Sequence, residues 1–273
     1  EKEAGKIKSI NEKGYGFFLS HQSQGIVRGS GVLVSADGDD LASDILSPMA
    51  ASFYSFSKGD SRQSYPSSQM GAIALLRQSF YDYKYYTETN VDFTDLSLEA
   101  WKSQMGIPKF FQTADKLEIL RANKIADEFE TNFIYLGSGN EYEAVHSLKE
   151  INPKIVIPIN FPAAYDVSDP YISRLIPLSQ LKHWELAPSN FRILKSNDIE
   201  VAISSKGIKS SADFWKNIHE LMASGVDKLA VLKALTETPA SFIGQEENIG
   251  TLEKNKVASF TVYSVDPFKN KKA

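Results

Sequence analysis

Short apolar runs alternate with amphipathic stretches from residue 108 onwards. The apolar runs predict strands at 110–113, 132–136, 154–159 and 200–204, and apolar residues at helical spacing predict helices at 115–130, 140–150, 178–197, 210–223 and 226–240. Strands that alternate with helices of this length are typical of a mostly parallel sheet. The run at 154–159 is almost entirely apolar, as expected for a strand that is buried on both faces.

The part of the chain before residue 108 has a different pattern. Residues 17–19 predict a short strand, and residues 26–35 predict a bent pair of strands whose glycines permit bulges. A long amphipathic helix is expected at 68–88, beginning at a serine, and a last strand at 259–263. The chain therefore holds about five strand–helix units, whereas a closed barrel of this type needs eight. The expected fold class is α/β. Either the opening strands supply the missing units of such a barrel, or the chain begins part-way through the fold and forms a partial TIM-like barrel.

The amino-acid composition excludes several classes of function. With 273 residues, 42% of them hydrophobic, the chain can form one large core, or one core with a small appendage. A net charge of −4 gives no electrostatic reason to expect nucleic acid as a partner. No apolar run is long enough to predict a membrane span. The absence of cysteine excludes disulfides, thiolate nucleophiles and Cys-rich zinc sites.

The histidines do not form a metal-binding motif, because none of the four stands at H-x-H or H-x-x-x-H spacing from another. Three of them, His146, His183 and His219, fall in predicted helices and are interpreted as surface or boundary residues. His21 ends a strand-like run, where a barrel places functional side chains, and is a candidate catalytic residue. A single histidine without a second histidine or a carboxylate is not a zinc site.

Nucleophile motifs are also missing, since the sequence has no G-x-S-x-G elbow. The turn at 137–139, Gly-Ser-Gly, follows a predicted strand. It is either a plain strand-to-helix turn or a site for an anion at a helix N-terminus. The neighbouring Glu141 and Glu143 are expected to be solvated, with no acid–base role.

The C-terminal third carries two ordered motifs, ALTETPASFIG at 234–244 and IGTLEKNKVASFTV at 249–262. They resemble the end of the metal-dependent amidohydrolases of the imidazolonepropionase-like group. This chain has Asn255 where that group usually has glycine, and Ser259 where it usually has aspartate. Asparagine is the residue that best replaces glycine at positive φ, so the turn can form. The resemblance covers roughly residues 20–265, and it implies a barrel portion at 1–245 and a return strand to a small β-sandwich at 246–273.

The resemblance also implies where a metal site should be. Active members hold zinc or another divalent metal with an H-x-H pair on the first strand, a histidine after each of strands five and six, and an aspartate after strand eight. The first-strand pair has no counterpart here, and that strand is expected upstream of Glu1. Gln112, Gly139 and Lys206 fall at the other positions. A lysine ammonium at the aspartate position repels a divalent cation, so no cofactor is predicted in this chain.

Three functions stay open at this stage. The first is a non-catalytic amidohydrolase-like domain that serves as a scaffold or binds a small-molecule ligand, as a homo-oligomer or beside another domain of a larger protein. The second is an active hydrolase of C–N bonds whose remaining ligands lie outside the chain, with Lys206 as a weak candidate for a base or a Schiff-base lysine. The third is a sugar- or peptide-binding module of the cell envelope, suggested by the aromatic residues at 53–56 and 81–86. The resemblance favours a periplasmic or secreted location.

Overall fold

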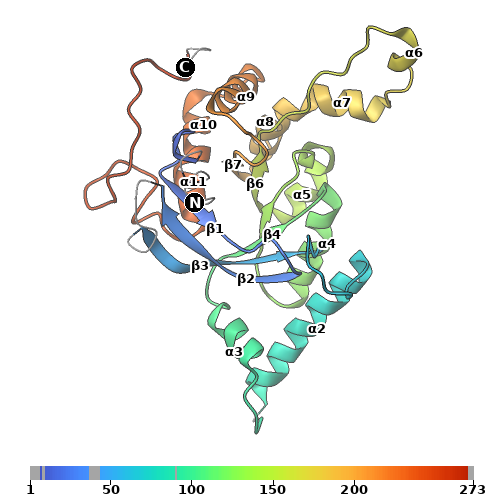
Figure 1. The fold of residues 1–273 in the computed structure, drawn as a ribbon, viewed down its shortest axis with the longest axis vertical. Helices are drawn as coiled ribbons and strands as arrows, with labels where there is room; N and C mark the ends of the chain where they lie inside the picture. Colours follow the sequence, from blue (N-terminus) through green and yellow to red (C-terminus); the bar gives the residue numbers. More distant parts are fainter. Residues whose placement is uncertain (1–6, 8–9, 37–43, 90, 270–273) are drawn as a thin grey trace. The chain divides into compact units, whose positions relative to one another are not determined.

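The computed structural model describes residues 7, 10–36, 44–89 and 91–269 (Figure 1). These residues form two compact units. The N-terminal unit holds the described residues within 1–11, 15–113 and 118–136, and the C-terminal unit holds 12–14, 114–117 and those from 137 onwards. Within the described part, no helix combines the length and apolar character that crossing a bilayer requires.

The strands of the N-terminal unit are β1 (Phe17–Ser20), β2 (Val27–Ser35), β3 (Ile45–Ser55), β4 (Lys109–Gln112) and β5 (Ile134–Leu136). The first three pair in antiparallel succession, and β3, β4 and β5 pair in parallel. The strand pair predicted within 26–35 is wrong, because this segment is one strand. Its register against β3 shifts at Val27/Ser30 and at Gly31/Leu33, and Gly29 has a φ of +74°, so the glycines bend a continuous strand instead of turning the chain.

The helices of the N-terminal unit are α2 (Gln69–Glu88), α3 (Leu96–Ser103) and most of α4 (Lys116–Glu128). The helix predicted at 68–88 is confirmed, and the Oγ of Ser68 accepts a hydrogen bond from the amide of Gly71 at 3.2 Å. This bond satisfies one of the free amides at the helix start. An aromatic core joins β3, α2 and α3. It consists of Tyr54, Phe80 and Trp101, whose ring centroids lie 5.1 to 6.5 Å apart.

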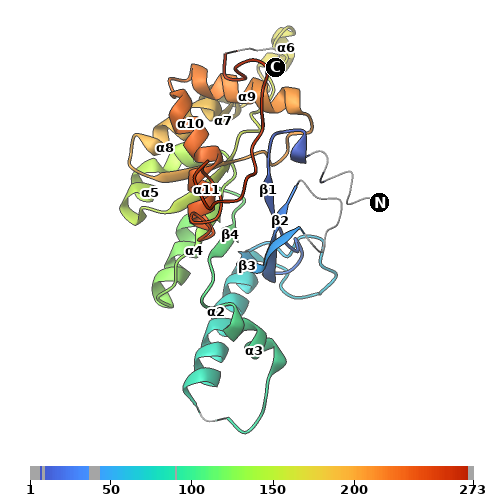
Figure 2. The same ribbon diagram turned by 90° about the vertical axis from the view of Figure 1, so that its left-hand side faces the viewer.

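The described part of the C-terminal unit has two strands, β6 (Lys154–Pro158) and β7 (Glu200–Ser204), and these pair in parallel. Its helices are η1 (Glu141–Ala144), α5 (Val145–Ile151), α6 (Pro170–Ser173), α7 (Leu178–Leu186), η2 (Ala187–Ser189), α8 (Asn190–Lys195), α9 (Ser211–Ala223), α10 (Lys228–Leu235) and α11 (Glu237–Phe242), several of which are labelled in Figure 2. The core positions of both strands, such as Ile155 and Val201, are almost fully buried. The strand–helix alternation predicted for this part is therefore confirmed, with a break in the last predicted helix at Thr236.

The end of the described chain departs from the prediction. Residues 259–263 are not a strand, since they have no pairing partner among the described strands, and a single extended segment leaves its backbone groups without a ladder. The turn before it agrees with the prediction, because Asn255 adopts a φ of +74°. The small β-sandwich and the boundary expected between residues 245 and 246 stay predictions.

Candidate functional site

In parallel α/β folds of barrel type, functional side chains gather at the carboxyl ends of the strands. His21 and Gln112 belong to the N-terminal unit, and Gly139 and Lys206 belong to the C-terminal unit. Each of the four has its own set of neighbours, and these neighbours decide what chemistry the position can support.

Gln112 is the last residue of β4, and its side chain binds the guanidinium of Arg28. Its Oε1 accepts a hydrogen bond of 2.6 Å from Nη1 of Arg28, on β2. The same guanidinium donates from Nε to the carbonyl of Gly25 at 3.0 Å and from Nη2 to the carbonyl of Ser57 at 3.1 Å. The oxygen that would be offered to a metal ion is therefore already bonded to a positive charge.

Arg28 is a buried charge with neutral partners. Only 7% of it is exposed, and burial lowers the pKa of its guanidinium, although arginine stays protonated in proteins. Within the described residues it forms no ion pair with a carboxylate. Three oxygens, from one amide side chain and two carbonyls, replace the water that the guanidinium loses. A divalent cation beside it would face a strong repulsion in this poorly hydrated place.

His21 is a packing residue in this structure. Its ring stacks on Phe53 with centroids 3.8 Å apart and an angle of 6° between the planes. Its Nδ1 lies 2.8 Å from the carbonyl of Gln22. The stacking packs the ring against β3, and the candidate catalytic role of His21 stays a prediction.

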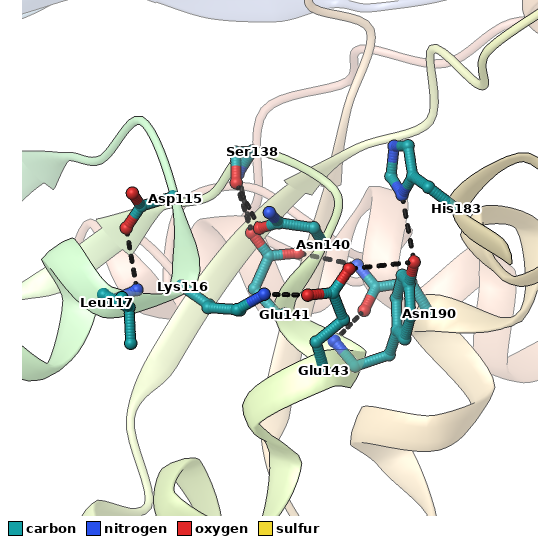
Figure 3. A network of polar contacts seen from close by, with 10 residues as sticks. Asp115, Lys116, Leu117, Ser138, Asn140, Glu141, Glu143, His183 and Asn190 are labelled. Atoms are coloured by element: carbon teal, nitrogen blue, oxygen red, sulfur yellow. Dashed lines mark hydrogen bonds and ion pairs between the residues drawn. The ribbon is translucent and has the colours of Figure 1, made fainter. Parts of the chain in front are cut away.

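The Gly-Ser-Gly turn binds an anion, and this anion is the carboxyl group of Glu141 (Figure 3). Oε1 of Glu141 accepts from the amides of Ser138 at 2.6 Å and Gly139 at 3.1 Å, and Oε2 lies 3.1 Å from the Gly139 amide. Gly137 leaves the room for this carboxyl group, because a Cβ there would overlap Oε1 and lie 2.9 Å from Cδ. The turn is thus occupied from within the chain.

Glu141 is completely buried, so the expectation that it is solvated is wrong. Asn190 supports it from α8, with Nδ2 donating to Oε2 of Glu141 at 2.7 Å and Oδ1 accepting from the amide of Tyr142 at 2.9 Å. These partners compensate the carboxyl group for the water it has lost. No local signal marks this burial in the sequence, since Asn190 lies 49 residues away.

The outer part of this network reaches the surface. Glu143 forms an ion pair with Lys116, and the hydroxyl of Tyr142 lies 3.0 Å from Nδ1 of His183 (Figure 3). The side chains of Lys116 and Glu143 are partly exposed, so this pair contributes little to stability. Glu143 is exposed as predicted, and the network as a whole is structural, because its polar groups bond to one another.

Lys206 lies in the exposed turn after β7, where its amide bonds to Oγ of Ser204 at 3.1 Å. Beside this turn is a cavity of about 700 Å³ that belongs wholly to the C-terminal unit. Its lining includes Asn160, which follows β6, together with Lys209 and Asp213. A ligand in this cavity would lie at the carboxyl ends of two parallel strands, the usual place for a site in such folds.

A divalent metal does not fit the donor atoms that the structure brings together. The described residues contain no group of three or more His, Asp or Glu side chains placed to hold one ion. Gln112 is bonded to a guanidinium, Gly139 has no side chain, and Lys206 is a cation. That the chain carries no metal remains a prediction, to be tested by measurement.

Comparison with solved structures shows which known fold this chain shares. No family model matches the chain, and neither does any curated protein. The crystal structure of an amidohydrolase from Thermotoga maritima MSB8 matches with a TM-score of 0.77 and 21% identity, over 97% of this chain and 70% of that one. The chain has the amidohydrolase fold. The resemblance inferred from residues 234–262 is therefore confirmed at the level of the fold, and so is the α/β class.

Other solved structures are less similar to this chain. They include a second amidohydrolase, with a TM-score of 0.44, 15% identity and cover of 63% of this chain and 42% of that one. A prolidase complexed with N-methylphosphonate-L-proline has a TM-score of 0.41 and 12% identity, over 60% of this chain and 40% of that one. The chain spans about two fifths of each of these two proteins.

Proposed function

We propose that this chain is a non-catalytic amidohydrolase-fold domain, and that it binds a small polar molecule at the carboxyl ends of β6 and β7. One observation carries the proposal: the bond between Arg28 and Gln112 puts a guanidinium at the end of β4, where an active relative is expected to use a histidine to hold a metal. A permanent, buried cation cannot coexist there with an open metal site of ordinary affinity.

Two further observations support the proposal. The Gly-Ser-Gly turn after β5 is filled by Glu141, so its amides are not free for a substrate oxyanion. Lys206 replaces the expected aspartate and stands in an exposed turn, whereas a Schiff-base lysine needs an apolar pocket or a neighbouring cation. Neither position offers a general base for a metal-bound water.

The cavity beside Lys206 is the proposed binding site for the small polar molecule. Asn160 and Asn217 contribute amide groups to its lining, and Lys209 and Asp213 contribute charges of opposite sign. Nδ2 of Asn217 donates to the carbonyl of Ile159 at 2.8 Å, which fixes this wall to the end of β6. A lining that both donates and accepts hydrogen bonds suits a small polar molecule without a large net charge.

The test is a turnover assay on the purified protein. The substrates are dipeptides, N-acyl amino acids and cyclic amides, each supplied with Zn²⁺, Mn²⁺ or Co²⁺, and the Lys206→Ala variant is measured in parallel. We expect no turnover above the metal-only blank in either protein. Metal-dependent hydrolysis that Lys206→Ala abolishes would establish the rival function, an active amidohydrolase that relies on this turn.

A further inference from the structure

The N-terminal unit contains a second cavity, of about 830 Å³, that the proposed function does not use. Its walls are the loop 22–26 with the first residue of β2, the loop 58–66 after β3, one face of α2, and α3. We propose that this cavity binds a neutral, hydroxyl-rich ligand of the oligosaccharide class.

The walls of the cavity are held in place by bonds, which is the first requirement for a binding site. Arg28 bonds to the carbonyls of Gly25 and Ser57 and so ties the two loops to one buried group. The amide of Gly25 donates to the carbonyl of Lys58 at 3.0 Å, which joins the loops directly. A cavity braced in this way loses little conformational freedom when a ligand enters.

The two helices are joined at the other side. The hydroxyl of Tyr86, on α2, donates to Oε1 of Glu99 on α3 at 2.8 Å and lies 3.4 Å from the amide of Asp95. Oδ1 of Asp95 in turn accepts from the amide of Ser97 at 2.8 Å and caps α3. Both helices therefore present fixed side chains to the space between them.

Exposed aromatic rings lie in the lining. Tyr85 is 62% exposed and Phe93 is 61% exposed, although both rings are large and apolar. Rings that stay accessible beside a cavity can stack on the C–H faces of a sugar while keeping a polar rim in water. Trp101 also lines the cavity, and its indole N–H meets no acceptor among the described residues.

The polar part of the lining combines three amide side chains with hydroxyl groups. Gln22, Gln24 and Gln63 each carry both donors and an acceptor, which matches hydroxyl groups that also donate and accept. The three charged groups of the lining are engaged within the unit. Nζ of Lys58 donates to the carbonyl of Gln63 at 2.5 Å, Oδ1 of Asp82 accepts from Gln78 at 2.6 Å, and Oδ1 of Asp95 accepts from the amide of Ser97. The lining therefore gives no strong attraction for a phosphate or a carboxylate.

A peptide is the weaker alternative. Peptide recognition commonly adds a strand to an open sheet edge or lays an apolar helix face into an apolar groove. The walls of this cavity are loops and helix surfaces with amide side chains, and no strand contributes more than its first residue, Val27 of β2. A neutral oligosaccharide uses both the rings and the amides.

The test uses the whole chain and four neutral hexasaccharides, made of β-linked glucose, α-linked glucose, β-linked N-acetylglucosamine and β-linked xylose. A capped neutral hexapeptide and inorganic phosphate are the comparison probes. Binding is followed by titration calorimetry and by tryptophan fluorescence, with Trp101→Phe to assign the optical signal. We expect saturable binding of at least one hexasaccharide and no binding of peptide or phosphate.

Two variants assign the binding to this cavity. Tyr85→Ala and Phe93→Ala should each weaken the hexasaccharide about tenfold, since each removes one stacking face. Leu96→Ala, on α3 but outside the lining, and Tyr171→Ala, on α6, should leave it unchanged; both are exposed apolar residues, at 81% and 79%. No binding up to about 10 mM, equal binding in all variants, or binding of the peptide alone would overturn the proposal. None of these outcomes would change the expected result of the turnover assay, because the two cavities belong to different units. A failure of this proposal can therefore be told apart from a failure of the proposed function.

Discussion

Nη1 of Arg28 donates to Oε1 of Gln112 across 2.6 Å, and this bond joins two residues that lie 84 positions apart in the sequence. The bond places the positive charge of Arg28 on the side-chain oxygen of Gln112. An amide is a suitable partner for a guanidinium, because it accepts a hydrogen bond without adding a titratable group. The proposed function rests on this bond, since a guanidinium is held where the amidohydrolase resemblance leads us to expect a metal ligand.

Removing Arg28 should destabilise the N-terminal unit. Arg28→Met leaves the oxygens of Gln112, Gly25 and Ser57 without their donor, and we expect the free energy of unfolding to fall by on the order of 3 kcal/mol. Arg28→Lys should recover only part of this loss, since one ammonium cannot span three acceptors. Urea denaturation followed by circular dichroism measures both.

The control for this prediction is Arg121→Met, at an exposed position of α4. It should change stability by less than about 0.5 kcal/mol. If Arg28→Met behaved like this control, the buried guanidinium would have no structural role.

Gly137 should not tolerate a methyl group. Gly137→Ala places a Cβ against the carboxyl group of Glu141 and displaces it from the amides of Ser138 and Gly139. We expect a loss of about 2–4 kcal/mol, because a buried carboxyl group and two amides lose their partners together. The melting temperature, measured by calorimetry, should fall accordingly.

Gly106→Ala is the matched control, since a Cβ at Gly106 meets nothing within 4 Å. It should be close to neutral. Equal effects of the two substitutions would mean that Glu141 does not depend on the space beside Gly137.

Lys109 should make stability depend on pH. It is 8% exposed, its Nζ donates to the carbonyl of Met105 at 2.7 Å, and burial lowers its pKa from the usual 10.5. Between the lowered pKa and 10.5 the unfolded chain binds more protons than the folded one, so this residue makes stability rise with pH through that window. Urea midpoints measured over a pH series test this.

The readout is the difference between the parent and Lys109→Met, because other groups also titrate at high pH. The variant should lack the part of the slope that Lys109 contributes, and Lys102→Met, at an exposed position of α3, should keep it. Identical slopes in the parent and in Lys109→Met would contradict the effect of burial on this lysine.

The parallel strands and most helices can be predicted from the sequence because their signals are local. Ser68 and the apolar spacing after it mark the start of α2, and the apolar run at 154–159 marks β6. The strand β3 gives no such signal, since a serine and a proline interrupt the apolar residues of its first half. It forms because it pairs with β2 on one side and β4 on the other.

The candidate positions could be located from the sequence, but their partners could not. Alignment of motifs with the amidohydrolases points to Gln112 and Gly139. Arg28 and Asn190, which decide what those regions do, come from distant parts of the chain and carry no motif. Burial of Glu141 in particular depends on tertiary packing that no local window contains.

The metal content of the purified chain tests the central claim most directly. The protein is incubated with excess Zn²⁺, freed of unbound metal by gel filtration, and analysed by inductively coupled plasma mass spectrometry. The account predicts well under 0.1 zinc per chain, both in the parent and in a Gln112→His variant, because Arg28 stays beside that position and Lys206 keeps its charge. About one zinc per chain in the parent protein would contradict it.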